Sequence, residues 1–305
     1  MMRSTGVRLL LGLLLLAPLL AGCEQEGSPE ATAPTFSSSP PAATPVYSFA
    51  VHPLHNPVRL HEVFSPLMRY LSAQVPGARF RLEASRNYDH YNRKIDAERP
   101  DFLLPNPYQT LRAQRHGYRV IAKMGDDDNF RGIILVRRDS DIDTVRDLAG
   151  GSISYPARTA LAATMMPQYF LQQEGLDVRH EVDNRYVGSQ ESAILNVYLG
   201  ETDAGATWPP PWRALAAERP ELAEALEIRW QTEPLPNNSV MAHARVDAGI
   251  AQRVAELLDQ LHERPEGERI LGPMELSRFE LATDTDYAPV VDFLQRFEHS
   301  IGPVE

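Results

Sequence analysis

The chain has 305 residues, of which 43% are hydrophobic, and a formal net charge of -11 at pH 7. This composition is that of a globular protein with a sizeable core, and an acidic balance without a basic stripe excludes a nucleic-acid partner. The presence of one cysteine excludes an intrachain disulfide and a zinc site built on several cysteine ligands.

The chain begins with a basic and then apolar segment that ends at this cysteine. An almost wholly apolar run over residues 9–20 leads through Ala21 and Gly22 into Cys23. The run is too short to span a bilayer comfortably, so we interpret residues 1–22 as a secretory signal peptide. The sequence Leu-Ala-Gly-Cys resembles the lipobox of bacterial lipoproteins, which implies cleavage before Cys23 and lipidation of its thiol. The alternative is a signal peptide with an incidental free cysteine.

The composition changes twice after the signal peptide. Residues 23–45 are rich in Pro, Ala, Ser and Thr and have no apolar periodicity, which predicts a flexible tether after the lipidated cysteine. Residues 46–305 alternate strand-like with helix-like segments, which predicts α/β sheets with parallel connections.

The predicted elements follow in chain order. Strands are predicted at residues 47–51, 80–84, 101–104, 118–123, 132–138, 152–155, 186–187, 204–206, 226–231 and 239–244. Helices are predicted at residues 56–74, 88–98, 106–117, 140–148, 159–173, 189–199, 248–261, 266–271 and 289–298, and a rigid proline-rich segment at 208–212.

Several predicted strands lead, after a short connection, into helices that begin at a polar residue. These residues are Asn56, Asn87, Asn106, Thr159 and Ser189. In open α/β sheets the ligand crevice lies at the carboxyl ends of the strands, and helix N-termini there present unpaired amides. The pattern favours a site for an anion or polar ligand. The alternative is that each residue only caps its helix, which contributes about 1 kcal/mol.

In their order and spacing, the motifs resemble the phosphate/phosphite/phosphonate-binding proteins of ABC transporters. The resemblance covers nearly all of residues 46–302, with markers at 87–88, 101–108, 132–140, 147–148, 155–167, 188–192 and 200–204. It implies an α/β, two-lobed periplasmic-binding-protein (type II) clamshell, whose hinge closes the lobes around an interlobe cleft. One lobe would comprise residues 46–137 and 240–305 and the other residues 138–239. The hinge would lie near residues 137–138 and 236–237.

The resemblance also implies which residues hold an oxyanion. The matching positions are Tyr88, Asn106 and Tyr108 in the first lobe and Thr159, Ala160, Ser189 and Gln190 in the second. Tyr88 matches a ligand-binding tyrosine of the family. Thr159 and the amides that follow it match a helix start that cradles the anion.

Because of two departures from the family pattern, the sequence does not predict which oxyanion is bound. Residues 157–161 read Ala-Arg-Thr-Ala-Leu where phosphonate binders have a hydroxyl-rich turn. Arg158 is therefore either a bidentate partner of the oxyanion or a solvated loop charge. Residues 208–212 lack the acid that aminoalkylphosphonate binders carry, which disfavours aminoethylphosphonate. Trp208 or Trp212 would stack on a ligand or line the cleft, and the alternative is that both simply pack in the core.

Together these features predict an extracytoplasmic solute-binding lipoprotein that captures phosphate, phosphite or a phosphonate for an ABC importer. It would act as a monomer on the periplasmic side of the envelope, held to a membrane by its lipid anchor. A second hypothesis keeps the fold but has the protein signal to a membrane histidine kinase instead of a permease.

Two further hypotheses are weaker. A metal-binding protein would use His52, His55, His61 and His90, but no carboxylate partner accompanies these histidines, so no metal site is predicted. An enzyme is not expected, because the sequence has no nucleophile elbow, zinc-protease motif, phosphate loop or dinucleotide fingerprint. Residues 126–128, three aspartates, are interpreted as a solvated turn, and no cofactor is predicted.

The lipoprotein interpretation predicts the behaviour of one variant. Cys23→Ser should fold and bind ligand as before but leave the membrane fraction, because the acyl chains that anchor the protein have no attachment point. Fractionation of cells that express each form measures this. A serine variant that stays with the membranes would refute the interpretation.

Overall fold

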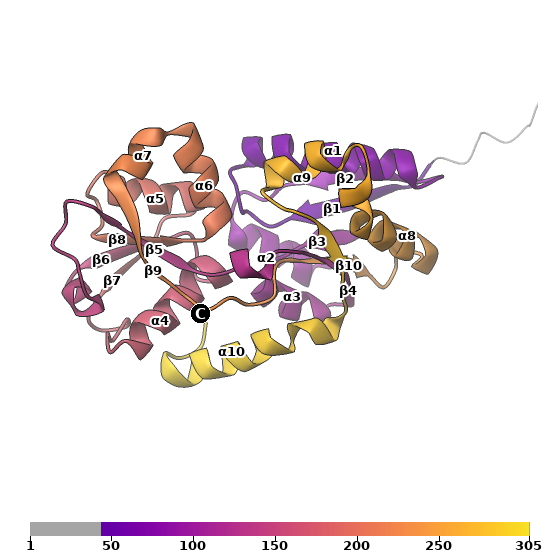
Figure 1. Cartoon of the computed structure of the whole chain (residues 1–305). Helices are drawn as coiled ribbons and strands as arrows, with labels where there is room; N and C mark the ends of the chain where they lie inside the picture. The colour runs from indigo at the N-terminus through magenta and orange to yellow at the C-terminus, as the bar shows by residue number, and fades with distance from the viewer. Residues whose placement is uncertain (1–43, 305) are drawn as a thin grey trace, which may run out of the picture. The chain divides into compact units, whose positions relative to one another are not determined.

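A computed structural model describes residues 44–304, which form two β-sheets flanked by helices (Figure 1). The predicted signal peptide, Cys23 and all but the last two residues of the predicted tether lie outside the described residues. Within residues 44–304, no helix combines the length and the apolar character needed to cross a membrane.

The six-stranded sheet has the order β11-β4-β10-β3-β1-β2. Its strands are β1 (Val46–Val51), β2 (Arg79–Glu83), β3 (Phe102–Leu104), β4 (Tyr118–Met124), β10 (Ser239–His243) and β11 (Phe279–Leu281). Strand β1 pairs in parallel with β2 and β3, whereas β10 is antiparallel to β3 and β4. Strand β11, the edge strand that pairs antiparallel with β4, was not predicted from the sequence.

The five-stranded sheet has the order β7-β6-β8-β5-β9. Its strands are β5 (Ile133–Arg137), β6 (Ser152–Tyr155), β7 (Asp183–Tyr186), β8 (Ala204–Thr207) and β9 (Leu226–Gln231). Strand β6 is parallel to β7 and β8, and β5 is antiparallel to β8 and β9. The two mixed sheets therefore confirm the predicted α/β class.

Helices cover both faces of each sheet, which explains why the inner strands β3, β8 and β10 are buried along their whole length. The helices that follow strands of the six-stranded sheet are α1 (Pro57–Gln74), α2 (Tyr88–Asp96), α3 (Pro107–Gln114), α8 (Ala248–Asp259), α9 (Gly267–Leu271) and α10 (Ala288–Ser300). Those that follow strands of the five-stranded sheet are α4 (Met166–Gln173), α5 (Gln190–Tyr198), α6 (Pro209–Glu218) and α7 (Pro220–Ala225).

Strand alternation divides the apolar side chains between these faces. Phe49 packs in a cluster with residues of α1 and α8, whereas its neighbour Ala50 belongs to a cluster with residues of α2 and α10. In the five-stranded sheet, Ile134 and Ile133 divide between two clusters in the same way. This is the period of two that a strand imposes on its side chains.

The chain crosses from the first sheet to the second earlier than the sequence predicted. Residues up to 137 were expected in the first lobe, but β5 pairs with β8 and β9 of the five-stranded sheet. The crossing therefore lies between Met124 and Ile133. The reason is that an apolar strand pattern does not say which sheet the strand will join. The return crossing lies between β9 and β10 and includes the predicted residues 236–237.

Three local predictions also differ from the structure. Residues 140–148 hold a short 3-10 helix at Val145–Leu148 instead of a full helix. The proline-rich segment 208–212 opens α6, because a proline in the first turn has no amide that needs an acceptor. The helix predicted from residue 159 begins at Leu161, as a π-helix over Leu161–Met165 that continues into α4.

The two crossing segments run side by side and are joined by hydrogen bonds. The Thr232 N–H donates to the Gly132 carbonyl at 2.9 Å, and the Leu235 N–H donates to the Phe130 carbonyl at 3.0 Å. The buried side chain of Asn237 donates through Nδ2 to the Gly125 carbonyl at 2.7 Å. Two of the predicted solvated aspartates also have structural partners, since Asp126 accepts from Ser277 and Asp127 accepts from Lys123.

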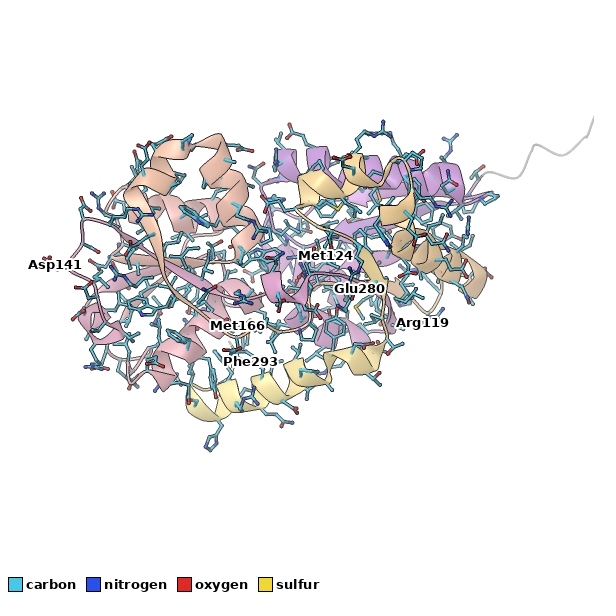
Figure 2. The ribbon with its side chains drawn as sticks, in the orientation of Figure 1. Arg119, Met124, Asp141, Met166, Glu280 and Phe293 are labelled. Atoms are coloured by element: carbon cyan, nitrogen blue, oxygen red, sulfur yellow. The ribbon has the colours of Figure 1, made fainter. Side chains whose placement is uncertain are left out.

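Side chains also connect the helices of the two sheets. Arg59 on α1 lies 3.3 Å from Glu218 on α6, and Arg213 on α6 lies 2.7 Å from Glu275, which follows α9. The C-terminal helix α10 adds a third connection, because its Phe293 shares a buried cluster with Met166 of α4 (Figure 2). Beyond α10, the Arg179 guanidinium donates to the Ile301 carbonyl at 2.8 Å.

Gly132 permits a close approach at the start of β5. A Cβ atom at this position would lie 2.6 Å from the Ala162 carbonyl oxygen and 2.6 Å from Cδ of Pro167. The π-helix would have to move to make room for it. Only glycine therefore fits between the outward crossing and this helix.

We expect Gly132→Ala to lower the free energy of unfolding by about 1–3 kcal/mol, the usual cost of overpacking. Urea unfolding of the purified protein measures this. The control is Gly272→Ala, because Gly272 has helical φ -54 and ψ -50 and its Cβ would meet nothing within 4 Å. Equal stability of both variants would contradict the tight contact at Gly132.

Candidate functional site

A small buried cavity lies where segments from both sheets meet. Its lining consists of His52, Tyr88, Asn106, Phe130, the run Ala160 to Ala163, Gln190 and Trp208. Its volume is about 10 Å³, which is about the room that one water molecule needs. The described residues that line it include no Asp, Glu, Lys or Arg, so the site offers hydrogen bonds in place of formal charges.

Four of the five polar helix starts predicted from the sequence cap their helices. Asn56, Asn87, Asn106 and Ser189 each accept a hydrogen bond from the backbone N–H three residues later, at 2.9–3.0 Å. Two of these caps also bond to residues that follow strands of the five-stranded sheet. Nδ2 of Asn56 donates to Glu191 at 2.8 Å, and Nδ2 of Asn106 donates to the Thr159 carbonyl at 2.9 Å. The caps therefore also help to hold the two sides together.

Tyr88 and Gln190 face the cavity from opposite sides. Tyr88 is the first residue of α2 and is 2% exposed. Burial raises the pKa of its hydroxyl. Hydrogen bonding with the neighbouring Gln190 side chain lowers this pKa to a smaller extent. Oε1 of Gln190 accepts from the Thr207 hydroxyl at 2.8 Å, which orients the amide and leaves Nε2 as a donor. Both side chains can therefore donate to a ligand oxygen.

His52 follows β1 directly and is 3% exposed. Its Nδ1 lies 3.0 Å from the Leu104 carbonyl oxygen. Burial lowers its pKa to about 4, against a smaller opposing effect of the bond to Leu104. The imidazole is therefore neutral at neutral pH.

The π-helix supplies backbone donors. Ala160 has φ -82 and ψ 95 and precedes the first helical residue, Leu161. The N–H groups at the start of a helix have no acceptor within it. The first backbone bond of this helix runs from Met165 to Ala160, and the N–H groups of Leu161, Ala162 and Ala163 donate to no backbone carbonyl in the described part of the chain. These amides belong to residues that line the cavity.

Thr159 does not cap this helix, contrary to the prediction. The helix begins two residues later than expected, so the Thr159 hydroxyl lies outside its first turn. This hydroxyl is buried and has no hydrogen-bond partner within residues 44–304, while the Thr159 carbonyl accepts from Asn106. The predicted role of Thr159 as a ligand contact stays a prediction.

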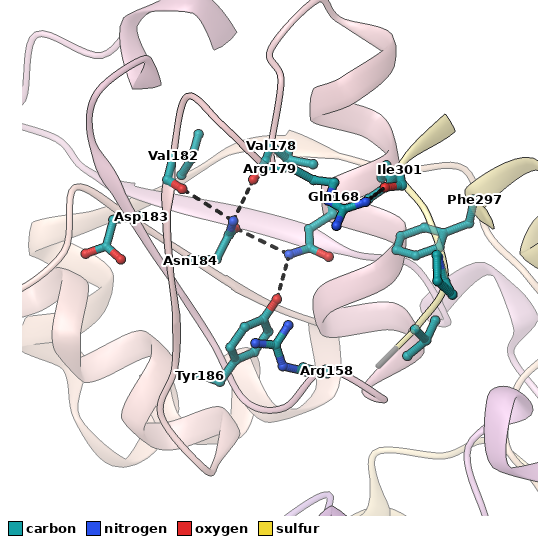
Figure 3. Close-up of a pocket in the computed structure, with 12 residues that line it drawn as sticks. Arg158, Gln168, Val178, Arg179, Val182, Asp183, Asn184, Tyr186, Phe297 and Ile301 are labelled. Carbon is teal, nitrogen blue, oxygen red and sulfur yellow. Dashed lines mark hydrogen bonds between the residues drawn. The ribbon is translucent and has the colours of Figure 1, made fainter. Parts of the chain in front are cut away.

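Arg158 lies at a different pocket (Figure 3). Its guanidinium carbon is 4.3 Å from the centre of the Tyr186 ring, and it lines a pocket of about 330 Å³ together with Gln168 and Asn184. The stacking on Tyr186 turns Arg158 away from the small cavity, whose lining does not include it. Tyr108 and Ser189 are also absent from that lining, since Tyr108 packs against an apolar cluster and Ser189 bonds to Ser192.

The aromatic wall of the cavity was predicted only in part. Trp208 lines it, is buried and meets Phe130 edge-on, with ring centres 5.6 Å apart. Trp212 instead packs in the core of the five-stranded sheet. Sequence reasoning missed Phe130, which carries no motif, and the alanines after Ala160. His52, which the sequence analysis considered as a metal ligand, also lines the cavity at the end of β1.

The structure gives the histidine cluster no support as a metal site. Within residues 44–304, no three His, Cys, Asp or Glu side chains are placed to hold a metal ion. His52 is buried beside the cavity, whereas His61 is exposed on α1.

Comparisons with known proteins agree with this architecture. A family model described as "ABC transporter, phosphonate, periplasmic substrate-binding protein" matches residues 49–287. The probable ABC transporter phosphite-binding protein PhnD1 of Prochlorococcus marinus (strain MIT 9301) is 25% identical over 121 residues, which cover 37% of this chain and 41% of that protein. The match thus spans less than half of the relative's length.

Solved structures support the same fold at low sequence identity. PhnD1 of Prochlorococcus marinus in complex with methylphosphonate has a TM-score of 0.76 and 18% identity, covering 83% of this chain and 98% of that one. A binding-protein component of an ABC phosphonate transporter from Pseudomonas aeruginosa has a TM-score of 0.75 and 15% identity, covering 83% and 87%. These likenesses confirm the predicted fold. The family match over most of the sequence shows that the chain belongs to the periplasmic substrate-binding proteins of ABC phosphonate transporters.

Proposed function

We propose that this chain captures a small phosphorus oxyanion, such as phosphite or methylphosphonate, and delivers it to an ABC permease. The observation that carries the proposal is a cavity with donors on both sides and no formal charge in its described lining. The oxyanion would accept hydrogen bonds from the Tyr88 hydroxyl, the Gln190 amide and the free N–H groups after Ala160.

Neutral donors suffice to hold an anion in such a place. Hydrogen bonds to an ionised acceptor are roughly twice as strong as those between neutral groups. The helical segment over residues 161–173 adds the positive end of its dipole. The net charge of -11 provides no long-range attraction for an anion, so capture depends on these local contacts.

The cavity walls favour a small apolar substituent on phosphorus. Phe130, Trp208 and the alanines around Ala162 lie beside the donors and suit a hydrogen atom or a methyl group. The described lining has no carboxylate to pair with an ammonium group, and an unpaired buried charge is costly. Aminoethylphosphonate should therefore bind poorly. The relative PhnD1, which is named for phosphite and was solved with methylphosphonate, supports the same ligand class.

Ligand entry requires the two sides to separate. A cavity of about 10 Å³ has no room for a tetrahedral oxyanion, so the site must expand as the ligand enters. Hinge motion between two sheets joined by crossing segments would provide this. The bonds from Asn56 to Glu191 and from Asn106 to Thr159 would break on opening and form again on closure.

The proposed partner and location follow from the family and from the N-terminal sequence. Membership in a transporter family supports delivery to a permease in preference to signalling to a sensor kinase. We propose that the protein works outside the cytoplasm as a monomer, anchored to a membrane by lipid on Cys23.

Thermal unfolding with candidate ligands tests the proposal. The set comprises phosphate, phosphite, methylphosphonate, aminoethylphosphonate and zinc. A ligand at one hundred times its dissociation constant stabilises the folded state by about 2.7 kcal/mol, which raises the melting temperature measurably. We expect a shift with phosphite or methylphosphonate. A shift with zinc alone, or with none of the set, would overturn the proposal.

Tyr88→Phe should weaken ligand binding by about 1–3 kcal/mol, because it removes one hydrogen bond to a charged ligand. Isothermal titration calorimetry measures the affinity. Two controls separate the cavity from the other residues implied by the resemblance. Tyr108→Phe and Arg158→Ala should bind like the unmodified protein, since neither residue lines the cavity. The reverse pattern would place the ligand elsewhere.

A further inference from the structure

The imidazole of His52 has a fixed hydrogen-bonding polarity. Nδ1 lies 3.0 Å from the Leu104 carbonyl oxygen. A carbonyl oxygen only accepts, so Nδ1 carries the hydrogen and donates it. In a neutral ring the other nitrogen, Nε2, then has a free lone pair and can only accept.

Nε2 is available to a ligand. His52 lines the cavity and is nearly fully buried. Within residues 44–304, the structure shows one hydrogen bond for this ring, the bond from Nδ1 to the Leu104 carbonyl. The Tyr88 and Tyr91 rings meet the imidazole edge-on, with centres 6.1 and 6.4 Å away, and the Tyr91 hydroxyl donates to the Ala50 carbonyl instead.

The surroundings keep the ring neutral. The titratable groups near it are Tyr88 and Tyr91 on α2 and His55, which precedes α1 and is itself close to the Arg59 charge. Burial and the Arg59 charge lower the pKa of His55 to about 4, and burial lowers that of His52 to about 4. The described lining of the cavity has no carboxylate that would favour the imidazolium. The ring therefore presents an acceptor throughout the neutral pH range.

We propose that Nε2 of His52 accepts a hydrogen bond from a protonated ligand oxygen, and that the site thereby selects oxyanions bearing an acidic P–OH group. This inference rests on the proposed function and adds a specificity-determining residue to it. Monoanionic phosphite and methylphosphonate carry such a proton. Sulfate and methanesulfonate carry no such proton at neutral pH. One of their oxygen lone pairs would therefore face the lone pair of Nε2. A buried polar atom left unpaired in this way penalises the wrong ligand.

Isothermal titration calorimetry of the whole protein tests this with four ligands: phosphite, methylphosphonate, sulfate and methanesulfonate. At pH 6 we expect the two phosphorus oxyanions to bind at least about tenfold more tightly than sulfate and methanesulfonate, as one hydrogen bond to a charged group contributes. As the pH rises beyond the second pKa of methylphosphonate, its affinity should fall by about tenfold per pH unit, because the dianion lacks the proton.

Matched variants place the selectivity on His52. His52→Phe should reduce the preference for methylphosphonate over methanesulfonate about tenfold or more, since the acceptor is gone. His55→Phe removes a neighbouring half-buried histidine that is outside the cavity lining and should leave that preference unchanged. If the His52 variant fails to fold, the ¹⁵N resonance of Nε2 in the unmodified protein still reports the bond, and it should move when phosphite is added.

The outcomes are distinct. Equal binding of methylphosphonate and methanesulfonate, or an affinity for methylphosphonate that does not change with pH, would overturn the role of His52 and leave the proposed function standing. An Nε2 resonance that does not respond to phosphite would also overturn it. Failure of both phosphorus oxyanions to bind at any pH would overturn the proposed function, and this inference with it.

Discussion

Asn237 joins the two segments through which the chain passes between its sheets, and the cavity depends on that connection. Its side chain donates to the Gly125 carbonyl at 2.7 Å, and its backbone N–H donates to Asp127 at 2.9 Å. Its own carbonyl accepts from the buried Tyr287 hydroxyl at 2.6 Å, just before α10. One asparagine therefore connects the outward crossing, the return crossing and the start of the C-terminal helix. Buried polar networks of this kind fix geometry because each unmade bond is costly.

Asparagine side chains near the site also make two structural contacts each. An asparagine amide has an acceptor at one end and a donor at the other. At Asn56 and Asn106 the oxygen caps a helix, while the nitrogen donates to Glu191 or to the Thr159 carbonyl, which follow strands of the other sheet. A serine or aspartate would cap as well, but an aspartate would have no donor for the second contact. The same residue thus begins a helix and links the two sides.

The sequence predicted those positions that follow directly from the order of strands and helices. Helix starts after strands were visible as Asn-Pro and Asn-Tyr pairs, so Tyr88 and Asn106 were found on the cavity. Arg158 and Thr159 precede the helix instead of opening it, because it begins as a π-helix two residues later than predicted, which no residue pattern indicated. The first crossing was misplaced because β5 has the same apolar pattern whichever sheet it joins. Phe130 has no motif, and only the three-dimensional arrangement places it opposite Trp208.

The size of the cavity has a consequence for the rate at which a ligand leaves. An enclosed ligand cannot depart through walls that leave room for about one water, so its residence time equals the waiting time for the two sides to part. That waiting time depends on contacts far from the ligand, among them the exposed ion pairs Arg59–Glu218 and Arg213–Glu275. Salt screens exposed charges. Dissociation should therefore quicken with ionic strength, although the described lining that holds the ligand carries no formal charge.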